Sequence, residues 1–266
     1  MKHITIILMA SLLAAVPALS RTDVMPQQPA VEVRVLSDSG GEYPQYRAHP
    51  ACERRDGSYF YMEAVRGESY SIQVTNRLDR RVGVVIAVDG RNIISGQKSW
   101  LRNSERMYIL EPYATGVFEG WRTGMDRTNR FYFTGHADSY AEKTFADATA
   151  MGTIAVAAYR EKARPVAPIT PSYDRDNSRA RGAGGRSASE KCARDDEAGT
   201  GFGKTTYSPA YEVAFEPESA VAGKVVLKYE WRSELCRKGI IGCEGPNRLW
   251  PVTGSGFAPI PDDFRE

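Results

Sequence analysis

The chain has 266 residues, of which 42% are apolar and 26% charged, and its formal net charge is +2. This composition is typical of a globular protein with one large domain or two small ones, and it excludes a wholly disordered chain. The balanced charge gives no reason to expect nucleic acid as a partner, or a polybasic contact with a membrane surface.

The first twenty residues have the three-part layout of a secretory signal. A short positive start at Met1-Lys2-His3 precedes an uncharged, mostly apolar stretch from 4 to 17, and Ala18-Leu19-Ser20 supplies small residues for cleavage. We therefore predict a signal peptide over 1–20 and a periplasmic or secreted mature protein. The alternative is an N-terminal membrane anchor, but the apolar stretch is shorter than the roughly 20 residues of a span. We expect no integral membrane segment after cleavage.

Four cysteines are found in the chain, at Cys52, Cys192, Cys236 and Cys243. An even number in an exported protein favours two disulfides. We expect Cys236–Cys243, because Gly239 and Gly242 let the short loop between them turn tightly, and this leaves Cys52–Cys192. A metal site is the alternative, although paired C-x-x-C spacing is missing and histidine is scarce.

The region 31–161 predicts one β-rich domain. Alternating or continuous apolar runs, separated by Gly and Pro, are found at 31–36, 59–64, 70–75, 82–88, 91–95, 107–110, 115–121, 130–134 and 153–159. The run 82–88 is nearly all apolar and β-branched, which predicts a strand buried on both faces. Asp89-Gly90 follows it and favours a type I′ hairpin turn. Residues 138–148 could hold a helical turn or two. The predicted fold is mainly β, as an antiparallel β-sandwich or an open barrel.

The rest of the chain predicts less order. Residues 21–30 are expected to be a disordered start, and 162–204 a flexible linker rich in Pro, Arg, Ser, Gly and Asp. The arginines of this linker alternate with acidic residues, which favours a solvated linker over a binding tail. Residues 205–241 predict a strand pair (211–215 and 224–231) docked on the first domain, followed by a helical turn. Residues 242–266 predict an irregular tail.

The stretch A-G-T-G-F-G-K-T from Ala198 to Thr205 fits a relaxed P-loop pattern. A phosphate-binding loop needs a buried strand before it and a helix after it. Acidic residues precede this stretch and Pro209 follows closely, so we expect neither nucleotide nor another cofactor.

Residues for catalysis are scarce. Only His49 and His136 remain after signal cleavage. His136 is near Asp138 and Ser139 in the sequence, but triads are assembled from distant loops, so a loop histidine is the preferred interpretation. No G-x-S-x-G motif presents a nucleophile. We assign no catalytic or metal-binding residue.

Trp121 and Arg122 end a predicted strand and have two interpretations. They could form an exposed stacking platform for a sugar or a partner side chain. Alternatively, Trp121 covers the sandwich core and Arg122 points outward, which is the interpretation we favour. With the turn residues Asp89 and Asn92, this pair is nevertheless our candidate binding surface.

Several motifs resemble a group of exported proteobacterial proteins without an assigned function. They are V-D-G-R-N-I-I-S-G (88–96), Y-I-L-E-P-Y (108–113), G-W-R (120–122) and F-Y-F (131–133). The G-T-G-F-G stretch (199–203), with Y-E-W-R (229–232) beyond it, resembles a tail found in some members. The resemblance implies a β-rich first domain, export, and a tail rather than a phosphate loop.

The leading functional hypothesis is a non-enzymatic binding module for an envelope or extracellular protein or glycan. One alternative is a cell-envelope hydrolase, which would need a cleft lined by two carboxylates with perturbed pKa values. The other is a structural protein that assembles through an unpaired edge strand.

Overall fold

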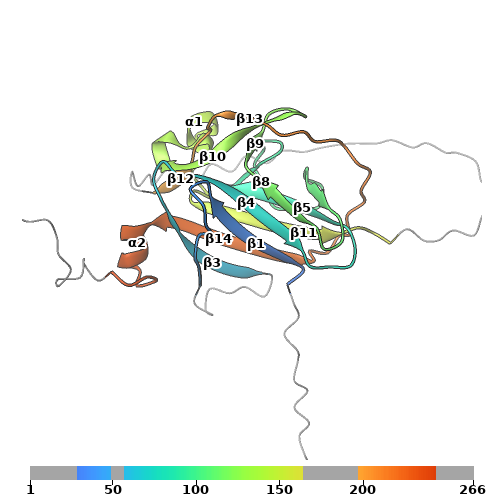
Figure 1. The fold of residues 1–266 in the computed structure, drawn as a ribbon, viewed down its shortest axis with the longest axis horizontal. Helices are drawn as coiled ribbons and strands as arrows, with labels where there is room; N and C mark the ends of the chain where they lie inside the picture. The colour runs from blue at the N-terminus through green and yellow to red at the C-terminus, as the bar shows by residue number, and fades with distance from the viewer. Residues whose placement is uncertain (1–28, 49–56, 164–196, 244–266) are drawn as a thin grey trace, which may run out of the picture.

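The computed structural model of the protein describes residues 29–48, 57–163 and 197–243. The predicted signal peptide, His49, Cys52 and Cys192 lie outside the described residues, as do most of the predicted linker and tail. The described strands form two seven-stranded sheets that are not closed into a barrel (Figure 1). The prediction of a mainly β fold is confirmed, and the arrangement of the two sheets is that of a β-sandwich.

The first sheet consists of β1 (Val31–Ser37), β4 (Ser69–Asn76), β8 (Thr115–Phe118), β9 (Gly120–Arg122), β10 (Arg127–Gly135), β12 (Ala198–Thr200) and β13 (Thr205–Tyr207). Its main order is β1-β4-β10-β12. The short strand β8 pairs with β4, and β9 and β13 pair with β10. All of these pairs are antiparallel.

The second sheet consists of β2 (Gln45–Arg47), β3 (Ser58–Ala64), β5 (Val82–Val88), β6 (Arg91–Asn92), β7 (Tyr108–Leu110), β11 (Thr153–Arg160) and β14 (Gly223–Trp231). Its order is β2-β3-β14-β11-β5-β6, and β7 also pairs with β5. The late strand β14 is antiparallel to β11 but parallel to β3. The last strand described in the chain therefore lies inside this sheet, between β3 and β11.

The core fills the space between the sheets with side chains from alternate strand positions. Val33 and Val35 of β1 belong to the same cluster as Val84 and Ile86 of β5, as expected for strands whose side chains point alternately to opposite faces. The largest fully buried side chains include Tyr70, Tyr229, Phe131, Phe133 and Met62. Burying a large apolar side chain contributes about 1.5–3 kcal/mol, so this shared layer stabilises both sheets together.

Strand β5 is buried on both faces, as predicted. Its outer side carries Val85, against which Leu101 and Met107 of a long loop pack. The strand turns back at Asp89-Gly90, whose φ angles of 47° and 76° are both positive, and Val88 pairs with Arg91. This is the predicted two-residue hairpin. The return strand β6 is shorter than the predicted 91–95.

The short helices are η2 (His136–Asp138), α1 (Tyr140–Phe145) and α2 (Arg232–Arg237). Helix α1 falls within the predicted helical segment 138–148, whereas η2 begins two residues before it, and α2 falls at the turn predicted after the last strand. The predicted disulfide between Cys236 and Cys243 is present, with 5.4 Å between the Cα atoms. In the three described ranges, no helix is both long and apolar enough to cross a membrane.

The predicted C-terminal strand pair is wrong. Strands β13 and β14 belong to different sheets, and residues 211–215 form no strand. Pro209 and Pro217 flank this segment, and proline cannot donate a backbone hydrogen bond to a ladder. The alternation of Val225, Leu227 and Tyr229 in β14 indicates a half-buried strand but does not specify its neighbours.

Two predicted boundaries are also wrong. Residues 198–200 belong to β12 and are buried, so the predicted linker does not extend to 204. Ala30, in the predicted disordered start, is buried, and its carbonyl accepts a hydrogen bond from the Arg77 amide at 3.0 Å.

Candidate functional site

The four residues of the predicted binding surface do not form a surface. Asp89, Asn92 and Trp121 are buried, and only Arg122 is partly exposed. The stacking platform, which was the less favoured interpretation, is therefore wrong. The favoured interpretation is correct for Trp121, which covers the core, but Arg122 is partly buried and bonded to Tyr108 and Ser208 rather than pointing freely outward. Each of these side chains has a structural partner that explains its position.

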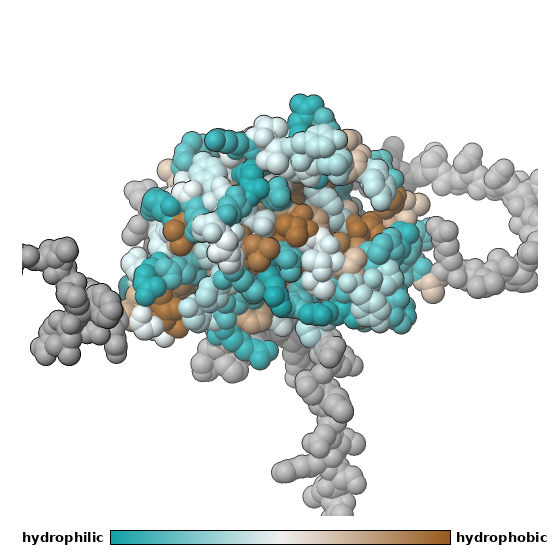
Figure 2. Space-filling model, viewed as in Figure 1, coloured by the Kyte–Doolittle hydropathy of each residue, from teal (hydrophilic) through white to brown (hydrophobic). Residues whose placement is uncertain are grey.

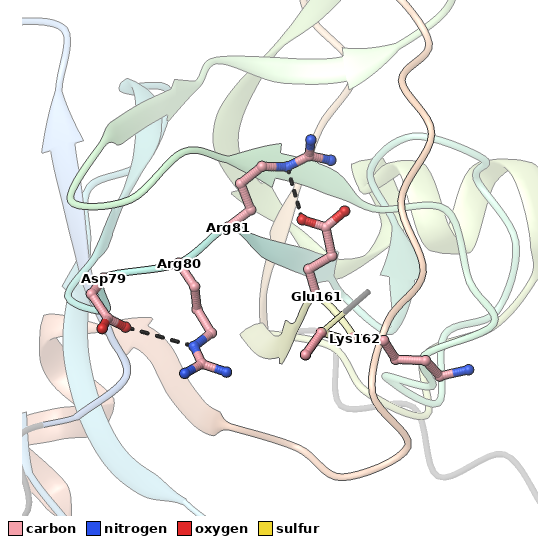
Figure 3. Close-up of a pocket in the computed structure, with 6 residues that line it drawn as sticks. Asp79, Arg80, Arg81, Glu161 and Lys162 are labelled. Carbon is pink, nitrogen blue, oxygen red and sulfur yellow. Dashed lines mark ion pairs between the residues drawn. The ribbon is translucent and has the colours of Figure 1, made fainter. Parts of the chain in front are cut away.

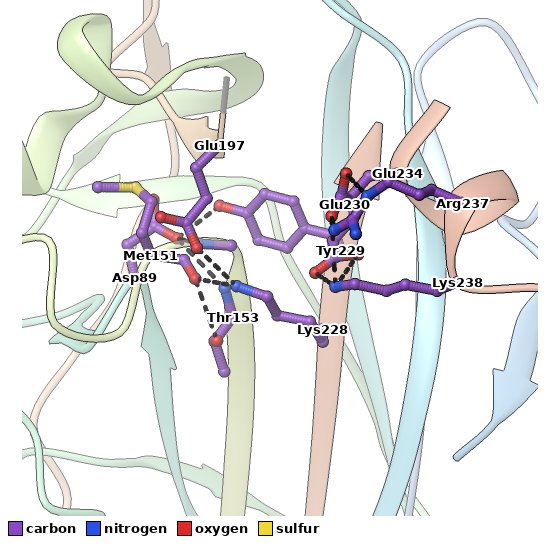
Figure 4. Close-up of polar contacts among 11 residues, drawn as sticks. Asp89, Met151, Thr153, Glu197, Lys228, Tyr229, Glu230, Glu234, Arg237 and Lys238 are labelled. Carbon is purple, nitrogen blue, oxygen red and sulfur yellow. Dashed lines mark hydrogen bonds and ion pairs between the residues drawn. The ribbon is translucent and has the colours of Figure 1, made fainter. Parts of the chain in front are cut away.

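Asp89 is the centre of a buried polar network at one end of the sandwich (Figure 4). Only 2% of the surface of this residue is exposed to solvent. Its carboxylate accepts hydrogen bonds from the amides of Thr200 (2.7 Å), Gly152 (2.8 Å) and Thr153 (3.3 Å), and from the Tyr229 hydroxyl (2.6 Å). Burial raises the pKa of Asp89 to about 6, against the opposing effect of these hydrogen bonds.

The network continues through hydroxyl groups into the first sheet. The Tyr229 hydroxyl of β14 lies 2.6 Å from Oγ1 of Thr200, which lies 2.7 Å from the hydroxyl of Tyr70 on β4. Burial raises the pKa values of both tyrosines well above their usual range. The network joins β5, β11, β12 and β14 to β4, which indicates a structural role.

Asn92 organises the long loop that covers β5. Its side-chain amide donates to the carbonyl of Arg106 at 2.9 Å, and its Oδ1 accepts from the amide of Ile94 at 2.9 Å. Within the same loop, Glu105 accepts hydrogen bonds from the amides of Trp100 and Arg102. The polar hairpin residue therefore holds a loop in place rather than facing a ligand.

The G-T-G-F-G stretch lies against β10 and has none of the geometry of a phosphate loop. It begins as strand β12, and the next regular element is strand β13 rather than a helix. A Cβ atom at Gly201 would lie 2.1 Å from Cζ of Tyr132, and one at Gly199 would lie 2.7 Å from Cβ of Ser139. These glycines allow close approach of two chain segments. The expectation that nucleotide does not bind remains a prediction.

His136, Asp138 and Ser139 do not form a triad. His136 is buried in η2, with its Nε2 3.9 Å from Glu142. Asp138 pairs with Lys143, and the Ser139 side chain accepts a hydrogen bond from the Glu142 amide as the N-cap of α1. Across the described ranges, no group of three or more His, Cys, Asp or Glu side chains is arranged to hold a metal ion.

A groove of about 660 Å³ is the largest of the depressions described here, and sequence reasoning missed it. It lies between the edge strands β7 and β8 and the extended segment 208–217, which we call the strap. The strap crosses from β13 in the first sheet to β14 in the second, on the right of Figure 1. We call the depression the strap groove.

The strap groove is lined by exposed apolar side chains. Val117 is 50% exposed, Tyr211 84% and Val213 46%, and Met125 is also exposed. Figure 2 shows apolar side chains, in brown, interrupting the hydrophilic surface on the face viewed in Figure 1. The charged groups at the rim include Arg106 and Glu212, which pair with each other at 3.2 Å. The groove therefore combines an apolar lining with a charge-balanced rim.

The strap is fixed at both ends and little bonded in its middle. At one end the Arg122 guanidinium donates to the backbone carbonyl and hydroxyl of Ser208, at 2.9 and 3.0 Å. At the other end the carbonyl of Glu216 accepts from the Lys162 amide at 2.8 Å. Between described residues, no backbone hydrogen bond connects 211–213 to β7 or β8. The outer edges of β7 and β8 have no strand partner within the described chain.

A depression of about 330 Å³ beside α2 is lined by three carboxylate side chains. Glu197, Glu230 and Glu234 line it, and they pair with Lys228, Lys238 and Arg237 respectively. Along β14, Lys228 and Glu230 point away from the core while Tyr229 points to Asp89 (Figure 4). The pKa raised by burial belongs to Asp89, which does not line this depression. The hydrolase hypothesis requires a cleft whose own carboxylates have perturbed pKa values. The carboxylate-lined depression and the carboxyl group with the raised pKa are instead in different parts of the molecule.

Another depression, of about 510 Å³, lies between the β4–β5 turn and the end of β11 (Figure 3). Four of its five charged side chains pair within the site, and Lys162 is the fifth. Arg81 lies 3.3 Å from Glu161, and Arg80 lies 3.6 Å from Asp79. The exposed Arg80–Asp79 pair contributes little energy, whereas Arg81 and Glu161 are partly buried. The two pairs leave no concentrated charge of one sign.

Comparison with known proteins adds no further constraint. No family, no curated protein and no solved structure matches this chain. The resemblance to exported proteobacterial proteins, and the export itself, therefore remain predictions.

Proposed function

We propose that this protein is a non-enzymatic binding module outside the cytoplasm, and that it holds an extended segment of a partner protein in the strap groove. The observation that carries the proposal is the gathering of exposed Val117, Met125, Tyr211 and Val213 in one groove. Contiguous apolar surface on a monomeric protein marks an interaction site more often than isolated exposed residues do.

The shape of the groove favours an extended polypeptide. The edge strands β7 and β8 offer unpaired backbone groups, which an added strand can use for main-chain hydrogen bonds. Alternate side chains of that strand would then meet Val117 on one side and Val213 on the other. The paired charges at the rim do not select a strongly acidic or basic partner.

Site-specific photo-crosslinking in the native host tests the proposal. A photoreactive residue is placed at 117 or 213 in the groove, and at 65 or 221 as matched controls. The controls are also valines, with exposures of 45% and 46%, and they do not line the groove. We expect one discrete adduct at 117 and 213 and none at 65 and 221.

A peptide that spans the crosslinked partner segment then provides the quantitative test. Val117→Glu should weaken its binding at least about tenfold, which corresponds to 1.4 kcal/mol, whereas Val65→Glu should leave it unchanged. Equal adducts at all four positions, or none, would contradict the proposal. An adduct with the mass of two copies of this chain would instead support assembly through the edge strand.

A further inference from the structure

A row of aromatic rings runs from the core to the surface and ends at Phe202. Ring centroids are 5.3 Å apart for Phe131 and Trp121, 4.5 Å for Trp121 and Tyr140, and 5.2 Å for Tyr140 and Phe202. The last two rings are stacked, with 25° between their planes. Phe202 is 42% exposed, so the row presents part of an aromatic ring to solvent.

The backbone around Phe202 is held on both sides. The Gly201 amide donates to the carbonyl of Tyr132 at 2.9 Å, and the Gly203 amide donates to the carbonyl of Arg130 at 2.9 Å. The Trp121 indole donates to the carbonyl of Gly201 at 3.0 Å. The apparent phosphate loop therefore works as a support that fixes one exposed ring.

Polar groups surround the ring in a depression of about 280 Å³, which we call the Phe202 shelf. Its lining residues are Tyr132, Asp138, Tyr140, Lys143, Thr144 and Phe202. Asp138 accepts a hydrogen bond from the Thr134 hydroxyl at 3.1 Å and lies 3.4 Å from the Tyr132 hydroxyl. It also pairs with Lys143.

The charge state of this rim is fixed near neutral pH. The hydrogen bond from Lys143 lowers the pKa of Asp138, and the same contact raises the pKa of Lys143. Both side chains are about half exposed or more, at 49% and 61%. The shelf therefore offers a carboxylate acceptor, an ammonium donor and a phenol beside an aromatic face, with no net charge from the pair.

These features select a neutral ligand that has an apolar face and hydroxyl groups at its edge. We propose that the Phe202 shelf binds one hexopyranose unit of a glycan, with the sugar ring on Phe202 and its hydroxyls on Asp138 and Lys143. The volume lies just below the roughly 300–1,000 Å³ of sites for drug-sized ligands, which suits a single sugar unit. The shelf shares no lining residue with the strap groove, so this site is independent of the proposed peptide site.

Saturation-transfer NMR on the protein purified from its host tests this site, with maltotriose, cellotriose and chitotriose as probes. We expect transfer to the ring protons of at least one trisaccharide, with a Kd of about 1 mM. Phe202→Leu keeps an apolar side chain but removes the aromatic face, so binding should weaken about tenfold. Asp138→Asn should weaken it to a similar degree.

Phe145 provides the matched control. It is 38% exposed and also packs on Tyr140, but it does not line the shelf. Phe145→Leu should therefore bind the sugar like the wild type. The proposal is overturned if none of the three trisaccharides receives saturation, or if Phe202→Leu and Phe145→Leu weaken binding equally. Val117→Glu, which blocks the strap groove, should not change the sugar signal.

Discussion

The network around Asp89 and the strap groove place polar and apolar groups in opposite ways. In the network, a carboxylate is 2% exposed and accepts hydrogen bonds from four donor groups. In the groove, Val117 and Tyr211 are 50% and 84% exposed and have apolar neighbours that face solvent. The hydrogen bonds within the fold account for the network, whereas no contact within the described chain accounts for the groove. This difference is why we assign stability to the first region and binding to the second.

Removing the Asp89 carboxylate should disrupt the buried network and cause the largest loss of stability. Asp89→Ala leaves three backbone amides and the Tyr229 hydroxyl without their acceptor in the interior. We expect a loss of about 3–5 kcal/mol in unfolding free energy, measured by urea denaturation. Asp79→Ala, whose side chain is 73% exposed, should change it by less than about 0.5 kcal/mol. A loss below 1 kcal/mol for Asp89→Ala would show that the network is dispensable.

The pH dependence of stability tests the structural role that we assign to Asp89. Because the pKa of Asp89 is raised from 3.8 to about 6 on folding, the folded state binds more protons between these values. The contribution of this carboxyl is therefore fully present below about pH 4 and falls as pH rises through about 6, by up to about 3 kcal/mol.

Other carboxyl groups titrate over the same range, so the wild type must be compared with Asp89→Asn. Measured by urea denaturation between pH 4 and 7.5, the stability of the wild type relative to this variant should fall as pH rises. A constant difference would show that the Asp89 carboxyl does not change its pKa on folding.

Gly201→Ala tests the close approach of the G-T-G-F-G stretch to β10. The added Cβ would lie 2.1 Å from Cζ of Tyr132, which must move. We expect a loss of about 1–3 kcal/mol by thermal or urea denaturation. Gly124→Ala, where the nearest atoms belong to the side chains of Arg127 and Asp126 at 3.2 Å, should cost less. Equal losses would mean that the stretch relaxes freely.

Arg122→Met tests the attachment of the strap and should act locally. It removes the hydrogen bonds to Ser208 while keeping much of the apolar stem. Amide exchange at Ser208 and Ala210 should become at least about tenfold faster, while exchange in β11 stays unchanged. Uniform acceleration across the protein would instead indicate global destabilisation.

Val213→Ser should have the smallest effect on stability and separate the two regions most clearly. The side chain is 46% exposed, so the unfolding free energy should change by no more than about 0.5 kcal/mol. Binding of the partner peptide should nevertheless weaken, as measured by titration. Val221→Ser, at equal exposure and away from the groove, is its control. Unchanged binding in Val213→Ser would remove this residue from the site.

The sequence predicted local elements well because their signals are local. The alternation in β1, the apolar run of β5 and the Asp89-Gly90 turn depend on neighbouring residues. The Cys236–Cys243 pair was also predictable, because only a short loop separates the two cysteines. These features identified a sandwich without identifying its strand order.

The sites were not predictable, because they depend on contacts between distant residues. Asp89 looks like a polar turn residue, and its burial is explained by donors far along the chain, which include Thr200, 111 positions later, and Tyr229, 140 positions later. Tyr211 and Val213 alternate like a strand, yet the flanking prolines leave the segment outside both sheets. The two prolines were the available signal for the strap. Which side of the sandwich it crosses is determined by Arg122 and Ser208.

The position of β14 has a consequence for the order in which this protein can fold. Its neighbours β3 and β11 are made first, and their facing edges cannot be joined until residues 223–231 have been synthesised. Such long-range pairing folds slowly. In a ribosome-bound chain that ends before residue 223, the edges of β3 and β11 that pair with β14 have no partner strand. Chaperones can bind such unpaired edges. The second sheet therefore forms its centre only after most of the chain has been synthesised.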